Sequence, residues 1–396
     1  MKILHITPEY PPIIWGGLGT AVGGLTKALA KEHYSVGVLL VGGALVLNKQ
    51  PYGSWETNSM EDLRDQFSTE KIIVRENILF FHVAPNEAWK IADVLSEYWV
   101  PDIIHLHTAW LLPVAMRIRE RCNCPIVFTV HSIDKAEYEV GKLFNHWQVQ
   151  EQAIDESDRI IAISESEKEI LAEYYPQAIN KVSVAGNGIE DYKEAELSSI
   201  KREWKETELT ILYTGRFVER KGIWDLIDAI PTVLTSFPKA KFVLAGGYGG
   251  GVEIEKECLV DTLTPFKNQV HFTGWLTPGE INGWYEKADM LVIPSWYEPF
   301  GMVVLEGMLY GLPIVATNIG GPSEILAHNV SAKLVPPKNP NALAESIIEL
   351  SRNTSLRKRL GIAGAKEVRK KWLWEKTVRK IEQAYSEAAF PPLMLD

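Results

Sequence analysis

Short apolar runs alternate with longer amphipathic segments along this chain, and that alternation restricts the fold more than any other feature. Lys2–Thr7 and Ser35–Val41 are typical of buried strands, and between them Leu18, Val22 and Leu25 fall on one face of a helix. Strands separated by helices pair in parallel, because a crossover connection needs about a dozen residues. The first half is therefore predicted to be a doubly wound α/β domain. Its further strands are expected at Ile78–Val83, Asp102–His107, Pro125–Val130, Ile160–Ser164 and Lys181–Val184.

The second half repeats this pattern after a break. Gly186–Gly188 predicts a turn, and a polar, charged stretch follows from Glu190 to Glu208. We expect a second doubly wound domain, with domain ranges 1–190 and 191–372 and a final segment 373–396. Strands are expected at Thr210–Thr214, Lys241–Ala245, Val270–Thr273, Met290–Pro294 and Ile314–Ala316, and helices at Gly222–Leu234 and Ala342–Leu350.

Composition narrows the class of protein. The 396 residues suffice for two domains. With 46% hydrophobic and 23% charged residues the chain is typical of globular proteins, which excludes disordered, collagen-like and coiled-coil classes. The 41 basic and 51 acidic residues give a net charge of −10. This argues against nucleic acid as the main partner, because phosphate backbones are held by basic faces.

Several features favour a cytoplasmic protein. Cys122, Cys124 and Cys258 are too few for a disulfide framework. The N-terminus lacks the apolar core and cleavage site of a signal peptide. The longest apolar run, Val36–Leu47, is far shorter than the roughly 20 residues that span a bilayer. The Lys- and Arg-rich tail, Ala363–Ala388, is predicted to be helical, and it either packs on the body or lies on the inner face of a membrane.

A glycine-rich segment, Pro11–Gly19, joins the first predicted strand to the first helix. Glycines such as Gly16 and Gly17 let the backbone approach a ligand closely, and the N–H groups at a helix start attract an anion such as a nucleotide phosphate. The dinucleotide fingerprint G-x-G-x-x-G fails here, because Val22 stands at the third glycine position. A structural turn is the alternative interpretation.

The segment from Thr214 to Gly222 also joins a strand to a helix. Arg216 can offer a bidentate fork to a diphosphate, and Lys221 adds a point charge near the positive end of the following helix. This pattern predicts a phosphate site that needs no metal ion. A solvated basic loop is the alternative.

Two carboxylates lie eight residues apart after another predicted strand. We expect Glu298 in a loop, where it can accept hydrogen bonds from sugar hydroxyls, and Glu306 inside the following helix. The backbone N–H groups of Gly301, Met302 and Val303 would then lie at the helix start, where they favour an anionic oxygen. Alternatively, Glu298 and Glu306 have unrelated roles.

Histidines stand at the ends of two predicted strands. His131 follows Pro125–Val130, where it can donate or relay a hydrogen bond near a reacting centre, although a satisfied structural histidine is the alternative. His105 and His107 point to the same face of another strand. Without an acid nearby they do not favour a metal site, so neither a metal nor a cofactor is expected.

These motifs together resemble the retaining glycosyltransferases of family 4. The first segment is similar to that of bacterial and archaeal glycogen and starch synthases, and Gly320–Glu324 is similar to the family's glycine pair after the last nucleotide-binding strand. The resemblance covers nearly the whole chain and implies the GT-B fold, in which two Rossmann-like domains face an interdomain cleft. The residues that carry it are Trp15–Gly19, His131, Arg216, Lys221, Glu298 and Glu306.

The resemblance also implies roles. The C-terminal domain would hold a nucleotide-sugar donor, the N-terminal domain would hold the acceptor, and the last helix would cross back to the first domain, with no divalent metal required. Arg216 and Lys221 are similar to the diphosphate clamp, and Glu306 is similar to the ribose ligand. His131 resembles the residue that contacts the donor sugar's primary hydroxyl. Gly16, Gly17 and Glu298 would make further donor contacts, together with the backbone of Phe300, Gly301, Met302 and Val303. The base would be held by the segment Phe272–Leu276, which includes Leu276.

One position departs from the glycogen synthases, which usually have a phosphate-binding Lys where this chain has Trp15. This favours an enzyme of cell-surface polysaccharide or glycoconjugate assembly. The expected reaction is retaining transfer of a hexose, with UDP-glucose as the first choice of donor, to a saccharide or lipid-linked acceptor. In one route the acceptor attacks the anomeric carbon on the face that the diphosphate leaves. In the other, a carboxylate attacks first and the acceptor then displaces it from the covalent intermediate. The first route is favoured, because no nucleophile is assigned.

Three other functions fit the chain less well. The combination of Arg216 and Lys221 with the two acids favours transfer over a nucleotide-sugar 2-epimerase. The complete set of expected cleft residues argues against a non-catalytic nucleotide-sugar sensor or subunit. An NAD-dependent dehydrogenase is disfavoured because both glycine clusters, Gly16–Gly19 and Gly246–Gly251, miss the dinucleotide fingerprint.

Overall fold

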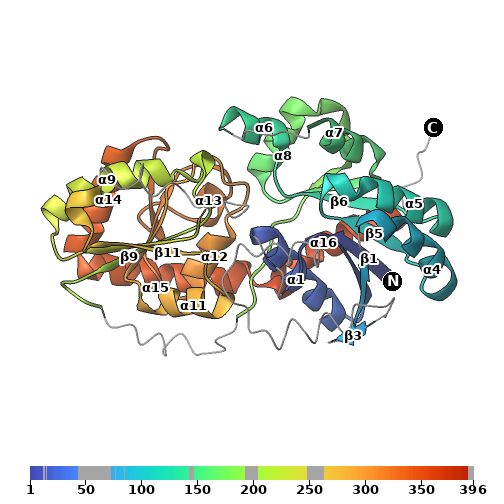
Figure 1. Ribbon diagram of the computed structural model, residues 1–396, viewed down its shortest axis with the longest axis horizontal. Coiled ribbons are helices and arrows are strands. Elements are labelled where there is room, and N and C mark those ends of the chain that lie inside the picture. Colours follow the sequence, from blue (N-terminus) through green and yellow to red (C-terminus); the bar gives the residue numbers. More distant parts are fainter. Residues whose placement is uncertain are drawn as a thin grey trace.

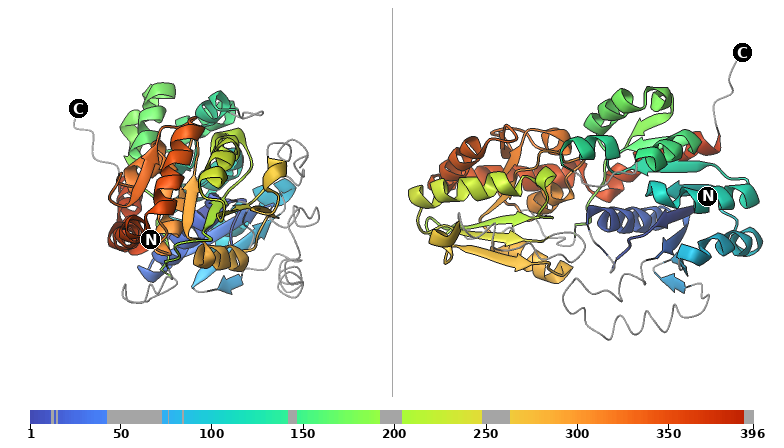
Figure 2. Two further views of the ribbon diagram at one scale, coloured as in Figure 1. Left: turned by 90° about the vertical axis from the view of Figure 1, so that its left-hand side faces the viewer. Right: turned by 45° about the horizontal axis from the view of Figure 1, so that its top comes forward.

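The computed structural model describes residues 1–11, 14, 16–42, 73–75, 77–83, 85–141, 147–191, 204–247 and 263–390. Several sequence features lie wholly or partly outside these ranges. They are Trp15, Cys258, the end of the apolar run at Leu47, residues 192–203 of the polar stretch, residues 248–251 of the second glycine cluster, and residues 391–396 of the final segment. The described chain forms two lobes, which lie side by side in Figure 1 and in the right-hand view of Figure 2. Among the described residues, no helix is both long and apolar enough to cross a bilayer.

The first lobe is built on an eight-stranded sheet with the strand order β3-β4-β2-β1-β5-β6-β7-β8. All neighbouring strands are parallel except β3, a short edge strand that runs antiparallel to β4. The strands are β1 (Lys2–Thr7), β2 (Ser35–Val41), β3 (Ile73–Arg75), β4 (Ile78–Val83), β5 (Ile103–Leu106), β6 (Ile126–Val130), β7 (Arg159–Ala162) and β8 (Val182–Val184). The helices are α1 (Gly17–Lys31), α4 (Ile91–Tyr98), α5 (Leu112–Cys122), α6 (Asp134–Glu139), α7 (Trp147–Glu156) and α8 (Glu165–Tyr174).

The second lobe holds a six-stranded parallel sheet with the order β11-β10-β9-β12-β13-β14. Its strands are β9 (Thr210–Thr214), β10 (Lys241–Ala245), β11 (Val270–Gly274), β12 (Met290–Ile293), β13 (Ile314–Thr317) and β14 (Ala332–Val335). Its helices are the one-turn 3-10 helix η5 (Glu219–Lys221), α9 (Ile223–Ser236), α11 (Pro278–Lys287), α12 (Met302–Leu309), α13 (Gly320–Ile325), α14 (Pro340–Arg352) and α15 (Thr354–Lys371). The prediction of two doubly wound parallel sheets is confirmed, although β3 and β14 were not predicted.

Both sheets are covered on both faces, which explains why their strands read as nearly continuous apolar runs. Along β1, for example, Leu4 and Ile6 belong to one core, and Ile3 belongs to the core on the opposite face. The second sheet is likewise enclosed between two cores, with Tyr213 of β9 on one side and Leu212 on the other. Polar groups placed just after these strands therefore sit at the edge of a rigid framework.

The predicted helical tail is wrong in one respect: it is two helices, α15 and α16 (Trp374–Ala389), separated at residues 372–373. The break is caused by the chain segment that links the lobes. The Ile189 N–H donates to the Trp372 carbonyl (2.8 Å), and the Trp374 N–H donates to the Ile189 carbonyl (3.2 Å). These hydrogen bonds hold Leu373 in an extended conformation and end the helix.

Helix α16 belongs to the first lobe in space, although it comes last in the sequence (Figure 1). It packs against α1 and the strands β5, β6 and β7. Trp374, Val378 and Tyr385 are buried in the same core as Val22 and Leu25 of α1. The Lys- and Arg-rich tail thus packs on the body with its apolar face.

Candidate active site

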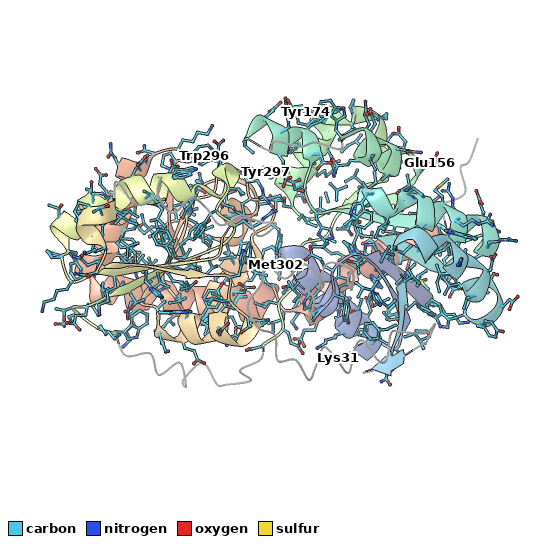
Figure 3. All side chains as sticks on the ribbon, in the orientation of Figure 1. Lys31, Glu156, Tyr174, Trp296, Tyr297 and Met302 are labelled. Carbon is cyan, nitrogen blue, oxygen red and sulfur yellow. The ribbon has the colours of Figure 1, made fainter. Side chains whose placement is uncertain are left out.

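Two helix starts from different lobes meet at the junction between the lobes. Helix α1 begins at Gly17 and α12 begins at Met302, and neither start has a side-chain cap. A Cβ atom added to Gly17 would lie 3.4 Å from Met302 Cγ, and Figure 3 shows Met302 at the junction beside α1. The N–H groups of a first helical turn have no partner inside the helix and attract anions. The segments singled out at Gly16–Gly17 and Gly301–Val303 are therefore brought together.

Gly301 makes the sharp entry into α12 possible. Its φ of 93° lies in the left-handed region, which glycine adopts without strain. The Gly320–Gly321 pair packs against the same loop, where the Gly321 N–H donates to the Glu298 carbonyl (3.0 Å). A Cβ atom at Gly320 would collide with the backbone of Glu298, and one at Gly321 would collide with the backbone of Phe300. The glycine pair is thus needed so that two backbones can pack closely.

The backbone and the side chain of Phe300 have different roles. The backbone belongs to the loop before α12, as expected. The ring points away to the segment that links the lobes, where it packs edge-on against Trp372, with ring centroids 5.6 Å apart, and lies over Gly186. The side chain therefore fixes the position of the linking segment, and only the backbone of Phe300 is placed beside the helix start.

Lys221 and Glu298 form an ion pair. Lys221 ends the helix η5, Glu298 follows β12, and the Lys221 ammonium donates to Glu298 Oε2. The Ser295 hydroxyl donates to the same oxygen (3.1 Å). Burial raises the pKa of Glu298, but the charges of Lys221 and Arg220 outweigh burial and hold the pKa below its ordinary value. The sequence placed these residues in separate motifs, whereas the structure joins them as one charged unit.

Arg216 follows β9, and its carbonyl accepts a hydrogen bond from the Tyr213 hydroxyl (2.8 Å). The residue is exposed, and its guanidinium makes no hydrogen bond or ion pair with any other described residue. Partial exclusion of water lowers the pKa of Arg216, while the carboxylates of Glu137, Glu298 and Glu9 oppose that shift. Because Glu9 and Glu137 belong to the first lobe, Arg216 lies at the junction, and its guanidinium has no hydrogen-bond partner within the described ranges.

Glu306 lies inside α12, as the sequence predicts, and is held by a residue that the sequence did not indicate. The Tyr285 hydroxyl of α11 donates to Glu306 Oε2 (2.6 Å) and lies 3.1 Å from Thr214 Oγ1. Burial raises the pKa of Glu306 above its ordinary value. Tyr285 occurs in an ordinary amphipathic helix, so no sequence signal could have assigned it this position.

Leu276 follows the edge strand β11 and is partly buried against the core that also contains Tyr285. Trp275 lies beside Gly247, where a Cβ would come within 2.9 Å of the indole nitrogen. The segment expected to hold a base thus packs against the loop after β10.

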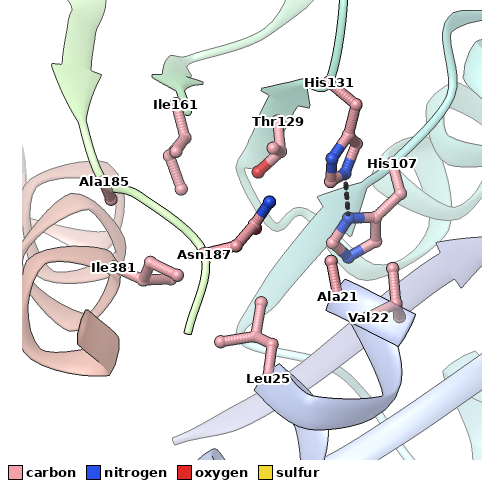
Figure 4. A pocket seen from close by; sticks show the side chains of 10 residues that line it. All are labelled: Ala21, Val22, Leu25, His107, Thr129, His131, Ile161, Ala185, Asn187 and Ile381. Atoms are coloured by element: carbon pink, nitrogen blue, oxygen red, sulfur yellow. Dashed lines mark hydrogen bonds between the residues drawn. The ribbon is translucent and has the colours of Figure 1, made fainter. Parts of the chain in front are cut away.

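His131 lies directly after β6, in the first lobe. Its Nε2 is 3.2 Å from Nδ1 of His107, and both rings line a small pocket together with the polar side chains of Thr129 and Asn187 (Figure 4). Burial lowers the pKa of His131 to about 4, so the ring is neutral at pH 7. His105 and His107 do share a face, as predicted, with ring centroids 4.1 Å apart.

Three sets of contacts join the lobes beside these residues. The Tyr297 hydroxyl accepts from the Ile133 N–H (3.0 Å) and donates to Glu167 Oε2 (3.0 Å). Arg220 Nε lies 3.3 Å from Glu137 Oε1. The Glu324 carboxylate accepts from two N–H groups at the start of α8, those of Glu165 (3.0 Å) and Ser166 (2.8 Å). Sequence reasoning did not identify Tyr297, Glu167 or Glu324 as residues that join the lobes.

Comparison with known proteins decides the family. Residues 15–192 match the family model of Glycosyltransferase Family 4, and residues 194–367 match that of glycosyl transferases group 1. One uncharacterised glycosyltransferase of Methanocaldococcus jannaschii is 29% identical over 98% of both chains, and another from the same organism is 31% identical over 76% of this chain and 79% of its own. This chain belongs to glycosyltransferase family 4.

Solved structures agree with the fold of this glycosyltransferase. HepE of Anabaena, crystallised with UDP and glucose, matches with a TM-score of 0.74 at 20% identity, over 98% of this chain and 99% of that chain. The glycosyltransferase therefore has the GT-B fold of two Rossmann-like domains, as the resemblance implied, and it is an enzyme that transfers glycosyl groups.

Proposed function

We propose that this glycosyltransferase moves a hexose from a nucleoside diphosphate sugar to a saccharide or lipid-linked acceptor, with retention of configuration at the anomeric carbon. The observation that carries the proposal is the meeting of two uncapped helix starts, at Gly17 and Met302, beside two cations, Lys221 and Arg216, that interact with Glu298 in the loop before α12. Both helix starts favour negative charge, and both side chains are cationic. An anion with several oxygens, such as a diphosphate, matches this arrangement.

The same groups would also promote departure of the diphosphate. Negative charge grows on the phosphate oxygens as the glycosidic bond breaks, and fixed cations and N–H dipoles stabilise that charge where it develops. Lys221 has three N–H donors, so it can keep its bond to Glu298 while it donates to a phosphate oxygen. The Arg216 guanidinium has no hydrogen-bond partner among the described residues, so it can donate two parallel N–H bonds to phosphate oxygens.

Glu298 is proposed to bind the sugar rather than to attack it. Its Oε2 is already occupied by Lys221 and Ser295, which fixes an ionised carboxylate that accepts hydrogen bonds from sugar hydroxyls. An acceptor attack on the face that the diphosphate leaves, with a phosphate oxygen taking the acceptor's proton, needs no protein nucleophile. We therefore favour this route over a covalent glycosyl-enzyme intermediate.

UDP-glucose is the proposed donor. The structural neighbour HepE was crystallised with UDP and glucose, and Glu306 in α12 offers a carboxylate for the two hydroxyls of a ribose. The test is calorimetric titration of the chain with UDP, ADP, GDP and their glucose conjugates. UDP-glucose should bind most tightly, with the same affinity in EDTA, and lack of binding by every nucleotide sugar would refute the proposal.

Stereochemistry is tested separately. Proton NMR of the first product formed from an α-linked donor should show an α anomer, and a β anomer would refute retention. When water takes the place of the acceptor, the released hexose has a free anomeric hydroxyl, and its signal is read before mutarotation. This measurement therefore does not depend on identifying the natural acceptor.

The exposed face of α15 supports contact with an anionic membrane that carries a lipid-linked acceptor. From Arg352 to Lys380 there are eleven basic and two acidic residues, although the whole chain has a net charge of −10. The exposed residues of α15 include Lys358, Arg359, Lys366 and Lys370. Sedimentation with phosphatidylglycerol vesicles should recover the wild type but not Lys366→Glu/Lys370→Glu, while phosphatidylcholine vesicles recover neither.

A further inference from the structure

A row of three histidines leads from the pocket at His131 into the interior of the first lobe. His131 Nε2 lies 3.2 Å from His107 Nδ1, and His107 Nε2 lies 3.0 Å from His5 Nδ1. The residues come from β6, from the end of β5 and from β1, which are neighbours in the sheet. Each ring therefore contacts the next through one nitrogen, so the row is a continuous hydrogen-bonded chain (Figure 4 shows its outer bond).

All three rings are neutral at pH 7. Burial lowers the pKa of His5 to about 3 and that of His131 to about 4. Burial also lowers the pKa of His107 far below its ordinary value, with a further contribution from the neighbouring histidines. A neutral imidazole carries one N–H and one lone pair. In a chain of such rings, the tautomer of one ring consequently fixes the tautomer of the next.

Only two arrangements of protons satisfy both hydrogen bonds. Either all three rings are Nε2–H tautomers and their N–H bonds point toward His5, or all three are Nδ1–H tautomers and their N–H bonds point toward His131. The two arrangements differ at the inner end, where His5 Nε2 is buried and has no hydrogen-bond partner in the described part of the chain. In the first arrangement this atom is a buried N–H without an acceptor, which is rarer in proteins than a buried acceptor without a donor. In the second arrangement the atom is unprotonated.

The outer end of the chain favours the same direction. When every ring donates toward His131, the proton of His131 stands on Nδ1, which has no hydrogen-bond partner among the described residues and is not a fully buried atom. The aligned N–H bonds then present their positive end at His131, just beyond the carboxyl end of β6, the edge at which parallel sheets bind ligands. Aligned hydrogen bonds also reinforce one another in a medium of low polarity.

We propose that His107, supported by His5, is a positioning residue that fixes His131 as the Nδ1–H tautomer, so that His131 meets the donor sugar as a hydrogen-bond donor. The proposal rests on the proposed function for the role of the sugar, but the proton arrangement does not depend on it. His131 is the group that would touch the ligand, and His107 acts only through it.

The neighbouring His105 explains why we interpret this cluster as a hydrogen-bonded chain rather than as a metal site. Ligand atoms of His5, His105 and His107 lie within 4.8 Å of one another. However, His105 Nδ1 is 2.6 Å from the Tyr385 hydroxyl, and its Nε2 is 2.6 Å from Thr129 Oγ1. Both nitrogens of His107 are also bonded, so among these three rings only His5 Nε2 has a lone pair that is not engaged, and one ligand atom does not make a metal site.

The first test reads the tautomers directly. Long-range proton–nitrogen NMR spectra of the full chain with 15N-labelled histidine, recorded without ligand at pH 7, distinguish Nδ1–H, Nε2–H and doubly protonated rings. The His131 signals are assigned by their loss in His131→Ala. We expect His5, His107 and His131 all to be Nδ1–H. An Nε2–H or charged His131, or one equivalent of tightly bound zinc by elemental analysis, would overturn the proposal.

The second test uses variants that differ in a single hydrogen bond. His107→Asn keeps an N–H donor at the position of Nδ1, whereas His107→Leu removes it. We expect His107→Leu to lower kcat/KM for the donor by about 10-fold to 100-fold, the range seen when a partner that orients another group is lost. His107→Asn should recover most of this loss and keep the Nδ1–H signal of His131.

His82→Leu provides the matched control, because His82 lies on β4 of the same sheet and outside the chain of histidines. It should keep wild-type kcat/KM. Equal losses in His107→Leu and His107→Asn would show a merely structural role and overturn the proposal. Wild-type kcat/KM in His131→Ala, together with an Nδ1–H signal in the wild type, would refute the donor-site role of His131 while leaving the proton arrangement established.

Discussion

Lys221 and Glu298, which are 77 residues apart in the sequence, form an ion pair at the junction of the two lobes. Their side chains are only 17% and 10% exposed. Each residue therefore provides the counter-charge that allows the other to stay ionised in a poorly hydrated place. The pair also connects the loop before α9 with the loop before α12, so the expected phosphate and sugar contacts are not independent of each other.

This coupling predicts how single and double variants behave. Lys221→Met and Glu298→Leu should each lower the free energy of unfolding by about 3–5 kcal/mol, because removal of one partner leaves the other charge buried and unpaired. Lys221→Met/Glu298→Leu should lose clearly less than the sum. Urea unfolding followed by circular dichroism measures all three variants, and additive losses would contradict the coupling.

Arg216 is expected to act during the reaction rather than in folding, because its guanidinium makes no hydrogen bond or ion pair with another described residue. Arg216→Ala should reduce kcat by roughly 10²–10³, the scale for one lost charge-stabilising donor, with an unchanged melting temperature. Arg216→Lys keeps the charge but not the fork and should recover only part of the activity. Arg117→Ala, at a partly exposed arginine of α5, is the control. Activity of Arg216→Ala within a few-fold of wild type would refute the role.

Glu306 and Tyr285 should affect donor affinity to different extents. Glu306→Ala loses a charged hydrogen-bond acceptor, which corresponds to roughly 10-fold to 100-fold weaker binding of the donor. Tyr285→Phe keeps the carboxylate but removes the hydroxyl that holds it, so affinity should fall only several-fold. Calorimetry with UDP-glucose measures both variants, and Tyr174→Phe in the first lobe is the control. An unchanged affinity in Glu306→Ala would contradict its assignment.

Glu167 predicts a pH dependence of stability. Burial raises the pKa of Glu167 to about 8 from an ordinary value of 4.5. The native state thus keeps a proton that the unfolded chain releases near pH 4.5. Stability from this group is complete below that pH and is lost progressively as the pH rises to about 8.

The measurement is the melting temperature between pH 5 and pH 8. The buried neutral histidines of the first lobe raise it with pH up to about 6.5 in the wild type and in Glu167→Gln alike, so the contribution of Glu167 is read as a difference between them. The wild type should lose stability relative to Glu167→Gln as the pH rises, because the glutamine does not titrate but can still accept the hydrogen bond from Tyr297. Glu165→Gln, an exposed position on the same helix, should keep the wild-type slope. Identical slopes in all three proteins would show that Glu167 does not titrate in this range.

Much of the fold could be predicted because it depends on local patterns. The apolar runs at Lys2–Thr7 and Thr210–Thr214 became central strands, and Glu298 and Glu306 lie in the loop and the helix expected of them. The edge strands β3 and β14 were missed because they are short and their sequences do not stand out from the neighbouring loops. The break at residues 372–373 was missed because its cause, Ile189, lies far away in the sequence.

Two doubly wound sheets and the chemistry available at their edges follow from the sequence, because the periodicity of apolar residues and the residue types after each strand are properties of short segments. Which of those residues meet follows from the three-dimensional fold: Lys221 with Glu298, Tyr285 with Glu306, and His5 with His107 and His131. Such pairs depend on the order and register of strands and on the approach of two lobes, and no local pattern encodes these distances.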